Sequence, residues 1–193
     1  MITLGITGGI GSGKSYVCRL LHGRGIPIYS CDDEAKRLMV ENATIRQQLQ
    51  ALIGDDAYTT DGTLNKPVIA QFLFANPDNA ALINGIVHPV VRQDFAQWVS
   101  HQTSPIAAQE CALLFESGFT DTVDKTVLVY APETLRLQRA MQRDHATAQQ
   151  IKARMAQQLD EEAKLQRADF CILNDGTADL EEQIEQLLTQ IAK

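Results

Sequence analysis

A glycine-rich segment near the start of the chain has the residue types of a phosphate-binding loop. Gly8-Gly9-Ile10-Gly11-Ser12-Gly13-Lys14-Ser15 matches the pattern G-x-x-x-x-G-K-[ST]. Glycines let consecutive backbone N–H groups turn toward phosphate oxygens, and a helix that begins there favours anions. Lys14 is placed to reach the β- and γ-phosphates, and the Ser15 hydroxyl to hold Mg²⁺. The pattern predicts a nucleotide site of the P-loop type. The alternative is a glycine-rich turn between a strand and a helix.

Carboxylates follow two other apolar segments and could complete such a site. In Ser30-Cys31-Asp32-Asp33, either aspartate could accept a proton from an attacking hydroxyl, or could instead cap a helix. Glu110 ends a further apolar segment and could hold Mg²⁺ through water. Glu116, just beyond it, could bind substrate or cap the next segment.

Basic side chains could bind the phosphoryl group. Arg136, Arg139 and Arg143 are spaced to share one side of a helix, where they could bind the charge that builds up during phosphoryl transfer. The alternative is a solvated helix face. His88, before Pro89, could contact a phosphorylated substrate or be a structural histidine at a helix start. We expect most of the remaining basic residues of this region to be surface charges: Lys152, Arg154, Lys164 and Arg167.

Short apolar segments alternate with helical patterns, which predicts an α/β fold with a parallel sheet. The predicted strands are 2–7, 26–30, 106–113, 126–131 and 170–173. A helix is predicted over 13–22, and a last helix follows the fifth strand, with one apolar face formed by Leu180, Ile184, Leu187, Leu188 and Ile191. Two stretches depart from this alternation of strands and helices. Residues 33–103 indicate a helical insertion with a turn at Asp61-Gly62 and breaks at Asn76-Pro77 and His88-Pro89. Residues 133–167 include a capping-box pattern that starts at Thr147.

Composition narrows the class of protein. The 193 residues suffice for one domain, or for one core with an insertion. A net charge of −7 argues against a general nucleic-acid or membrane-surface role. The four cysteines form no C-x-x-C pair, so we expect buried thiols in a reducing cytosol rather than zinc or redox sites. Without a leader pattern or a membrane-length apolar run, the predicted location is cytoplasmic.

The residues alone predict a P-loop phosphotransferase with two mobile insertions. No Asn-Lys-x-Asp motif supports a GTPase, and the chain is short for a mechanical ATPase. Two alternatives stay open. One is a kinase for another small molecule, and the other is a nucleotide-dependent switch or binding module. Asp32 and the arginine row argue against the switch.

The ordered set of motifs resembles the dephospho-CoA kinase family along essentially the whole chain. There are three departures from the family pattern. This chain has Ser30-Cys31-Asp32 where the family has Asp-Ala-Asp. It has Ala112 where the family often has proline, and Glu110 where an aspartate is common. The matching segments are Ile6 to Ser15, Cys31-Asp32, Phe74-Ala75-Asn76-Pro77, His88-Pro89, Leu113-Leu114-Phe115-Glu116, Gln138-Arg139, Gln142-Arg143-Asp144, Arg167-Ala168-Asp169 and Asn174-Asp175-Gly176.

The resemblance implies a P-loop NTPase core with a five-stranded parallel sheet flanked by helices (1–32, 104–132 and 168–193). It also implies a helical CoA-binding insertion (33–103) and a helical lid (133–167). The implied reaction is ATP-dependent phosphorylation of the ribose 3′-hydroxyl of dephospho-CoA, with Mg²⁺. The implied partners are ATP and dephospho-CoA, without nucleic acid or membrane, in a monomer or small homo-oligomer.

The resemblance also assigns residues. Asp32 would be the base, with Lys14 and Arg139 the other catalytic residues, and Ser15 and, through water, Glu110 would hold the metal. Nucleotide binding would involve Gly9, Gly11, Ser12, Gly13, Lys14, Ser15, Tyr16, Arg139 and Arg143. Substrate binding would involve Asp32, His88, Leu114, Phe115 and Glu116.

Overall fold

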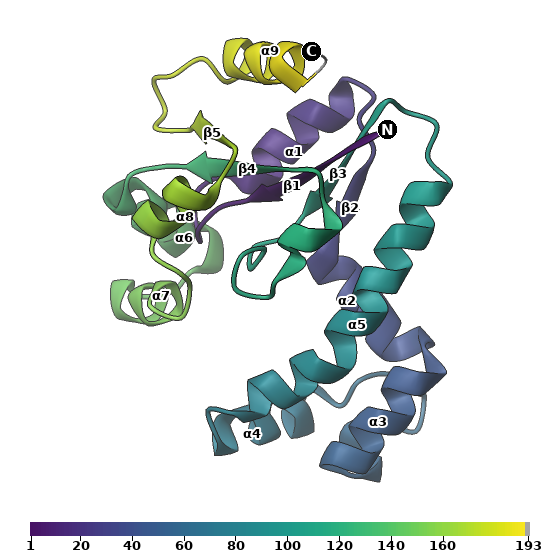
Figure 1. Cartoon of the computed structure of the whole chain (residues 1–193). Helices are drawn as coiled ribbons and strands as arrows, with labels where there is room; N and C mark the ends of the chain where they lie inside the picture. The colour runs from purple at the N-terminus through teal and green to yellow at the C-terminus, as the bar shows by residue number, and fades with distance from the viewer. Residues whose placement is uncertain (192–193) are drawn as a thin grey trace. The chain divides into compact units, whose positions relative to one another are not determined.

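A computed structural model describes residues 1–191 and contains a five-stranded, entirely parallel sheet (Figure 1). The strand order is β2-β3-β1-β4-β5, so β1 lies in the centre of the sheet. Because all strands run the same way, the loops that follow them gather at one edge of the sheet. The predicted α/β fold is confirmed. The strands are β1 (Ile2–Thr7), β2 (Ile28–Ser30), β3 (Ile106–Glu110), β4 (Lys125–Tyr130) and β5 (Phe170–Leu173).

Two strands are shorter than the sequence predicts. β3 ends at Glu110 rather than at residue 113, because the backbone beyond it turns on itself: Ser117 N donates to Leu113 O at 2.8 Å. β2 begins at Ile28, because the N–H of Ile26 bonds to Leu21 O at the end of the preceding helix. Local backbone hydrogen bonds therefore set both limits.

Helices α1 (Lys14–Gly23) and α9 (Leu180–Ile191) pack in one hydrophobic core with the sheet. Leu4 and Ile6 of β1 are fully buried in this core. Side chains alternate along a strand, so Gly5 faces the other way, where an added Cβ would lie 2.8 Å from Leu114. The segment after β3, which includes the short helix η2 (Phe119–Thr122), therefore packs tightly on the second face.

Three helices connect β4 to β5: α6 (Glu133–Asp144), α7 (Ala148–Met155) and α8 (Glu161–Arg167). The predicted capping box is present at the start of α7. Thr147 accepts from Gln150 N, and the Gln150 side chain accepts from Thr147 N at 2.9 Å. We refer to these three helices and the turns between them as the α6–α8 segment.

Residues Cys31–Ser100 form a compact unit of their own, separate from the unit that contains Met1–Ser30 and the chain from His101 onward. Arg37 of α2 and Asp94 of α5 join two of its helices at 3.0 Å. The turn predicted at Asp61-Gly62 is present, with a φ of 83° at Gly62. The elements of this unit are α2 (Cys31–Glu41), α3 (Ala43–Ile53), η1 (Asp55–Ala57), α4 (Lys66–Ala75) and α5 (Asn79–Ser100).

The break predicted at His88-Pro89 is wrong, whereas the one at Asn76-Pro77 is confirmed. α4 ends at Ala75, but α5 continues through Pro89. Pro89 cannot donate to the carbonyl of Gly85, four residues earlier. Both residues are exposed, so water can satisfy that carbonyl. A proline on the solvent side of a long helix therefore interrupts one bond and not the helix.

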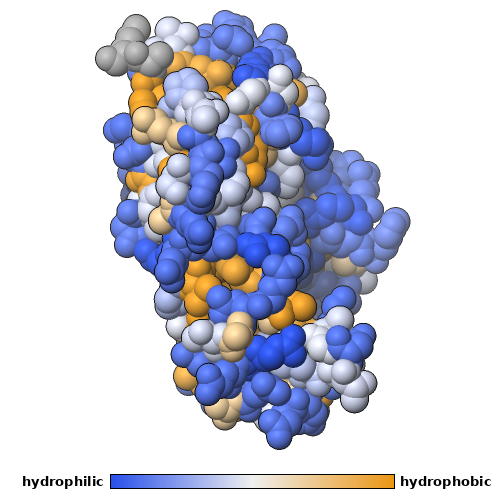
Figure 2. Space-filling model, turned by 90° about the vertical axis from the view of Figure 1, so that its right-hand side faces the viewer, coloured by the Kyte–Doolittle hydropathy of each residue, from blue (hydrophilic) through white to orange (hydrophobic). Residues whose placement is uncertain are grey.

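The cysteines and the surface complete this description. Cys18, Cys31 and Cys111 are buried as expected, but Cys171 is exposed on the edge strand β5, which corrects that expectation. In the described part of the chain, no helix has both the length and the apolarity to cross a membrane. The face drawn in Figure 2 is mostly hydrophilic, with smaller apolar areas between.

Candidate active site

The glycine-rich loop bends between β1 and α1 at the carboxyl edge of the sheet. Gly11 and Gly13 have φ values of 80° and 88°, in the left-handed region that favours glycine. A Cβ at Gly11 would lie 2.1 Å from the carbonyl oxygen of Arg136, and one at Gly13 would lie 2.1 Å from Asn174 Nδ2. Conformation and close packing therefore both require glycine at these two positions.

The N-terminus of α1 is open to an anion. Gly13, its N-cap residue, has no side chain to accept the first amides, and the first turn carries no acidic residue. Helix N-termini with unpaired N–H groups carry a partial positive charge. This end of α1 can therefore bind phosphate oxygens through its backbone.

Glu110 joins the two polar side chains of the P-loop. Its Oε1 atom accepts from Lys14 Nζ at 2.6 Å and from Ser15 Oγ at 2.7 Å. Burial alone would raise the pKa of Glu110, but the Lys14 ammonium and the hydrogen bonds from Lys14 and Ser15 hold this pKa below its ordinary value. An ionised carboxylate is thus held beside a hydroxyl oxygen.

This donor set suits Mg²⁺. Magnesium prefers oxygen ligands and usually keeps waters and substrate phosphates in addition to one or two protein groups. No cluster of three or more His, Cys, Asp or Glu side chains that could hold a metal occurs among residues 1–191. Ser15 and Glu110 therefore fit a magnesium ion shared with a nucleotide, rather than an all-protein metal centre.

Asn174, directly after β5, supports the loop from the other side, and the site prediction missed it. Its side chain is buried, and Nδ2 donates to Ser12 O at 2.8 Å. Its own carbonyl accepts from Arg139 Nη1 at 2.9 Å. In the sequence, Asn174-Asp175-Gly176 stands out only as a segment that matches the family, with no predicted role in the site. Its place at the carboxyl end of a parallel strand is the signal that could have identified it.

The three arginines of α6 have three different environments. Arg136 is only 7% exposed, and its Nε donates to Ala131 O at 3.1 Å. Arg139 lies against the turn at Asn174. Arg143 is exposed and pairs with Asp144 at 2.7 Å. The structure thus brings Arg136 and Arg139 to the P-loop and its support, whereas Arg143 lies at the far end of the helix.

The turn between α7 and α8 touches the P-loop directly. The backbone N–H of Ile10 donates to Gln158 Oε1 at 3.0 Å. Lys164 of α8 is fully buried, 3.1 Å from Glu161 and 3.6 Å from Glu116, which corrects its expected place among the surface charges. Sequence reasoning missed Gln158 and Glu161. Only the i, i+3 spacing of Glu161 and Lys164 indicated a pair.

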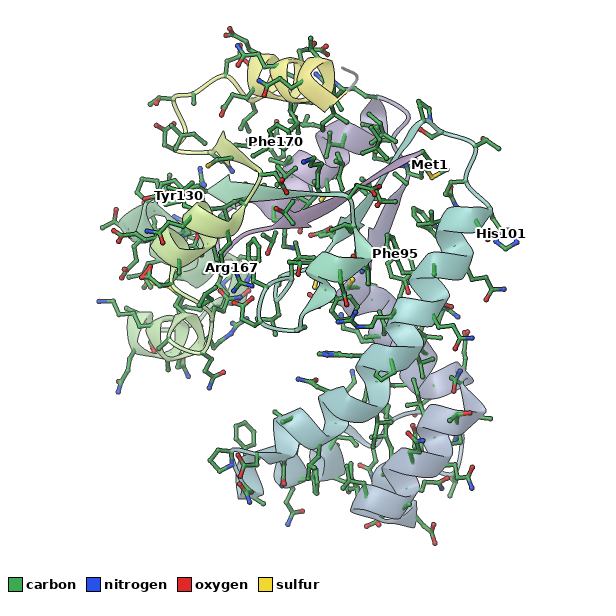
Figure 3. All side chains as sticks on the ribbon, in the orientation of Figure 1. Met1, Phe95, His101, Tyr130, Arg167 and Phe170 are labelled. Carbon is green, nitrogen blue, oxygen red and sulfur yellow. The ribbon has the colours of Figure 1, made fainter. Side chains whose placement is uncertain are left out.

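Of the other predicted substrate residues of this unit, Glu116 contacts the same turn. Leu114 and Phe115 are buried, and Glu116 Oε1 accepts at 2.8 Å from Leu159 N, an amide 43 positions later in the chain rather than one of the next segment. The Arg167 guanidinium lies 4.7 Å from the centre of the Phe115 ring. Figure 3 labels Arg167 at the end of α8 and Tyr130 at the end of β4. Tyr16, predicted to bind nucleotide, is exposed on α1, under the guanidinium of Arg19.

Asp32 and His88 belong to the helical unit. Ser30, the last residue of β2, pairs with Glu110, and Asp32 follows two residues later in the first turn of α2. Asp32 is exposed, whereas Asp33 pairs with Lys36 at 3.0 Å. Burial and then the nearby Arg92 charge lower the pKa of the half-buried His88. The roles of Asp32 and His88 in the site stay predictions.

Comparisons with known proteins match most of the chain to a single family. A family model described as dephospho-CoA kinase matches residues 2–179. The dephospho-CoA kinase of Bacteroides fragilis (strain YCH46) is 46% identical over 188 residues, which cover 97% of this chain and 91% of that protein. The chain belongs to the dephospho-CoA kinase family. It is therefore a kinase that acts in the final step of coenzyme A biosynthesis.

Solved structures extend the similarity to both units. The structure of TT1252 from Thermus thermophilus has a TM-score of 0.87 and 32% identity, covering 100% of this chain and 98% of that one. A dephospho-CoA kinase from Campylobacter jejuni has a TM-score of 0.71 and 26% identity, covering 98% and 96%. The dephospho-CoA kinase family predicted from the motifs is thus confirmed.

Proposed function

We propose that this chain transfers the γ-phosphoryl group of ATP to the ribose 3′-hydroxyl of dephospho-CoA, using the P-loop, Glu110 and Asp32. The observation that carries the proposal is the shared carboxylate oxygen. Lys14 and Ser15, the two motif residues expected to act on phosphate and metal, meet at Glu110 beside the open N-terminus of α1.

The nucleotide half of the mechanism relies on backbone and charge. The amides from Gly11 to Ser15 bind the phosphates, and Lys14 exchanges Glu110 for the β- and γ-phosphate oxygens. Arg139 supplies further positive charge, and Gly9, Tyr16 and Arg143 also bind the nucleotide. Ser15 and, through water, Glu110 would hold Mg²⁺, which would supply positive charge to neutralise the phosphate oxygens.

The acceptor half places a base at the start of α2. Asp32 takes the proton of the ribose 3′-hydroxyl while the 3′-oxygen forms a bond to the γ-phosphorus. The bond from that phosphorus to the bridging oxygen breaks, and its electron pair leaves with ADP. Dephospho-CoA is held by His88, Leu114, Phe115 and Glu116, with the 33–103 insertion as its binding domain.

Residues 133–167 act as a lid in this proposal. Arg136 and Gln158 already connect this segment to the P-loop and its flanks. Bound phosphates add charge that draws the basic side chains inward, and closure excludes water that competes with the ribose hydroxyl. Hydrogen exchange in the lid should slow on adding an ATP analogue and dephospho-CoA, whereas exchange in β4 stays nearly constant.

The deciding experiment is ATP turnover with and without dephospho-CoA. We expect ADP formation to require dephospho-CoA, and the product to carry a new phosphate on its 3′-oxygen. Adenosine and nucleoside monophosphates serve as control acceptors. Slow ATP hydrolysis that no acceptor changes would support a nucleotide-dependent switch instead.

The position of the base is tested by two neighbouring carboxylates. Asp32→Asn preserves shape and removes the base, so kcat should fall by about 10²–10⁴ while ATP binding changes little. Asp33→Asn is the matched control, because Asp33 is already paired with Lys36. If Asp33→Asn proved the more damaging change, the base would be the other aspartate.

A further inference from the structure

Gln158 presents an unused donor next to the P-loop. The backbone N–H of Ile10 can only donate, so the Gln158 atom that faces it at 3.0 Å must be the carboxamide oxygen. The amide orientation is therefore decided by chemistry, and the NH₂ group points away from Ile10. Within residues 1–191, Gln158 Nε2 has no hydrogen-bond partner.

The backbone around Gln158 is held on both sides. Gln158 N donates to Met155 O at 3.0 Å, and the next amide, Leu159 N, donates to Glu116 Oε1 at 2.8 Å. Beyond the turn, the fully buried Lys164 ties Glu161 to Glu116. Gln158 thus lies on a turn whose backbone is held by these contacts. Its side-chain oxygen adds a further contact, which joins this turn to the P-loop.

Positive charge accompanies this donor. A Cβ on Gly9 would lie 2.4 Å from Arg136 Nη1 and 2.6 Å from Glu161 Oε1, so both groups lie against the loop residue that precedes Ile10. Glu161 Oε1 is paired with Lys164 at 3.1 Å, whereas its Oε2 is buried with no hydrogen-bond partner among the described residues. Arg136 and the Gln158 NH₂ group therefore supply donors at the part of the loop where the α6–α8 segment meets it.

We propose that Gln158 contacts the nucleotide directly: its oxygen stays on Ile10 N, and its NH₂ group donates to a terminal phosphate oxygen of ATP. This inference rests on the proposed function, because it requires ATP at the P-loop. A carboxamide suits the position because it accepts from the loop and donates to an anion at once. A carboxylate of the same shape could do only the first.

The isosteric change Gln158→Glu separates the two roles. It keeps an acceptor for Ile10 N, removes the donor and adds a negative charge beside the phosphates. A hydrogen bond to a charged group is worth enough that kcat/KM for ATP should fall by about tenfold to a hundredfold. Melting temperature without nucleotide should stay at the wild-type value.

The matched controls use the neighbouring residue and the truncated side chain. Gln157→Glu introduces the same charge on an exposed side chain one residue away and should leave kcat and KM unchanged. Gln158→Ala removes donor and acceptor together and should lose both activity and some thermal stability.

Binding measurements make the test independent of turnover. Gln158→Glu should weaken binding of a non-hydrolysable ATP analogue more than binding of ADP, because only the analogue carries the γ-phosphate. Wild-type constants for Gln158→Glu would overturn the inference and leave Gln158 as a cap for Ile10. An equal loss for both nucleotides together with a lower melting temperature would overturn it too, in favour of a structural role. If wild-type protein bound ATP but phosphorylated no acceptor, the proposed function would fail while this comparison still decided the contact.

Discussion

The P-loop and the α6–α8 segment both bring positive groups to the same place, but they do so by different means. The loop uses backbone amides, and its geometry depends on glycines such as Gly11 and Gly13 within a few residues of one another. The α6–α8 segment uses side chains, and each one depends on what packs against its helix. Arg136 is buried near the loop, whereas Arg143, on the same helix, is exposed.

The difference shows why one pattern could be interpreted from sequence and the other could not. A left-handed turn followed by a helix start is a local property of the chain. A row of arginines at helical spacing predicts only a shared helix side. Neighbouring backbone, such as the carbonyls of Ala131 and Asn174, determines which guanidinium turns where.

The largest effect in this comparison should come from the buried cation of α8. Lys164→Met leaves Glu161 and Glu116 without their ammonium, and removing one partner of a buried ion pair costs about 3–5 kcal/mol of unfolding free energy. Chemical denaturation measures the loss. Lys152→Met, an exposed lysine of α7, is the control and should be nearly neutral. A stable Lys164→Met protein would show that the segment does not depend on this ion pair.

Lys14→Ala tests the loop itself. The ammonium is expected to stabilise charge on the transferred phosphoryl group, and loss of one such group typically lowers kcat by about 10²–10³. The fold should persist, because the side chain lies at the edge of the core and its partner Glu110 keeps Ser15. Steady-state kinetics on a protein with a wild-type circular dichroism spectrum gives the answer. A near-normal kcat would remove Lys14 from the mechanism.

Substitutions of Arg139 and Arg143 compare the part of α6 near the P-loop with the far end of the same helix. Arg139→Ala should reduce kcat by roughly tenfold, which corresponds to one charge-assisted hydrogen bond, and should weaken ATP binding less than that. Arg143→Ala should have a smaller effect, since that guanidinium is exposed and paired with Asp144. Kinetics and ATP binding measured on both variants decide the order. The reverse order would assign the larger contribution to Arg143 and contradict the proposed role of Arg139.

The smallest effect concerns pH and Glu110. Because its pKa is held below the ordinary value in the folded protein, the carboxylate contributes stability above the unfolded-state pKa and loses it as pH falls through the lower folded value. The melting temperature of wild type should therefore exceed that of Glu110→Gln at neutral pH, and the gap should close in acid. A gap that is constant with pH would mean that ionisation of Glu110 does not stabilise the loop.

The parts of the fold that were predicted correctly have local causes. The strand, the glycine-rich loop and the helix of the P-loop unit, the capping box at Thr147 and the end of α4 before Pro77 each depend on residues close in sequence. The errors have non-local causes. Pro89 is tolerated because it lies on the solvent side of α5, and Lys164 is buried because Glu116, which is 48 positions earlier in the sequence, reaches it.

The sequence by itself determined the phosphate-binding chemistry, the α/β class and the family, because glycine conformation, strand hydrophobicity and ordered motifs are carried by the chain without reference to its partners. Only the tertiary structure decided that Glu110 holds both Lys14 and Ser15, that Asn174 supports Ser12, and that Gln158 reaches Ile10. The physical reason is that parallel strands bring their carboxyl ends to one edge, so residues more than 90 positions apart meet there through side-chain hydrogen bonds that no local pattern encodes.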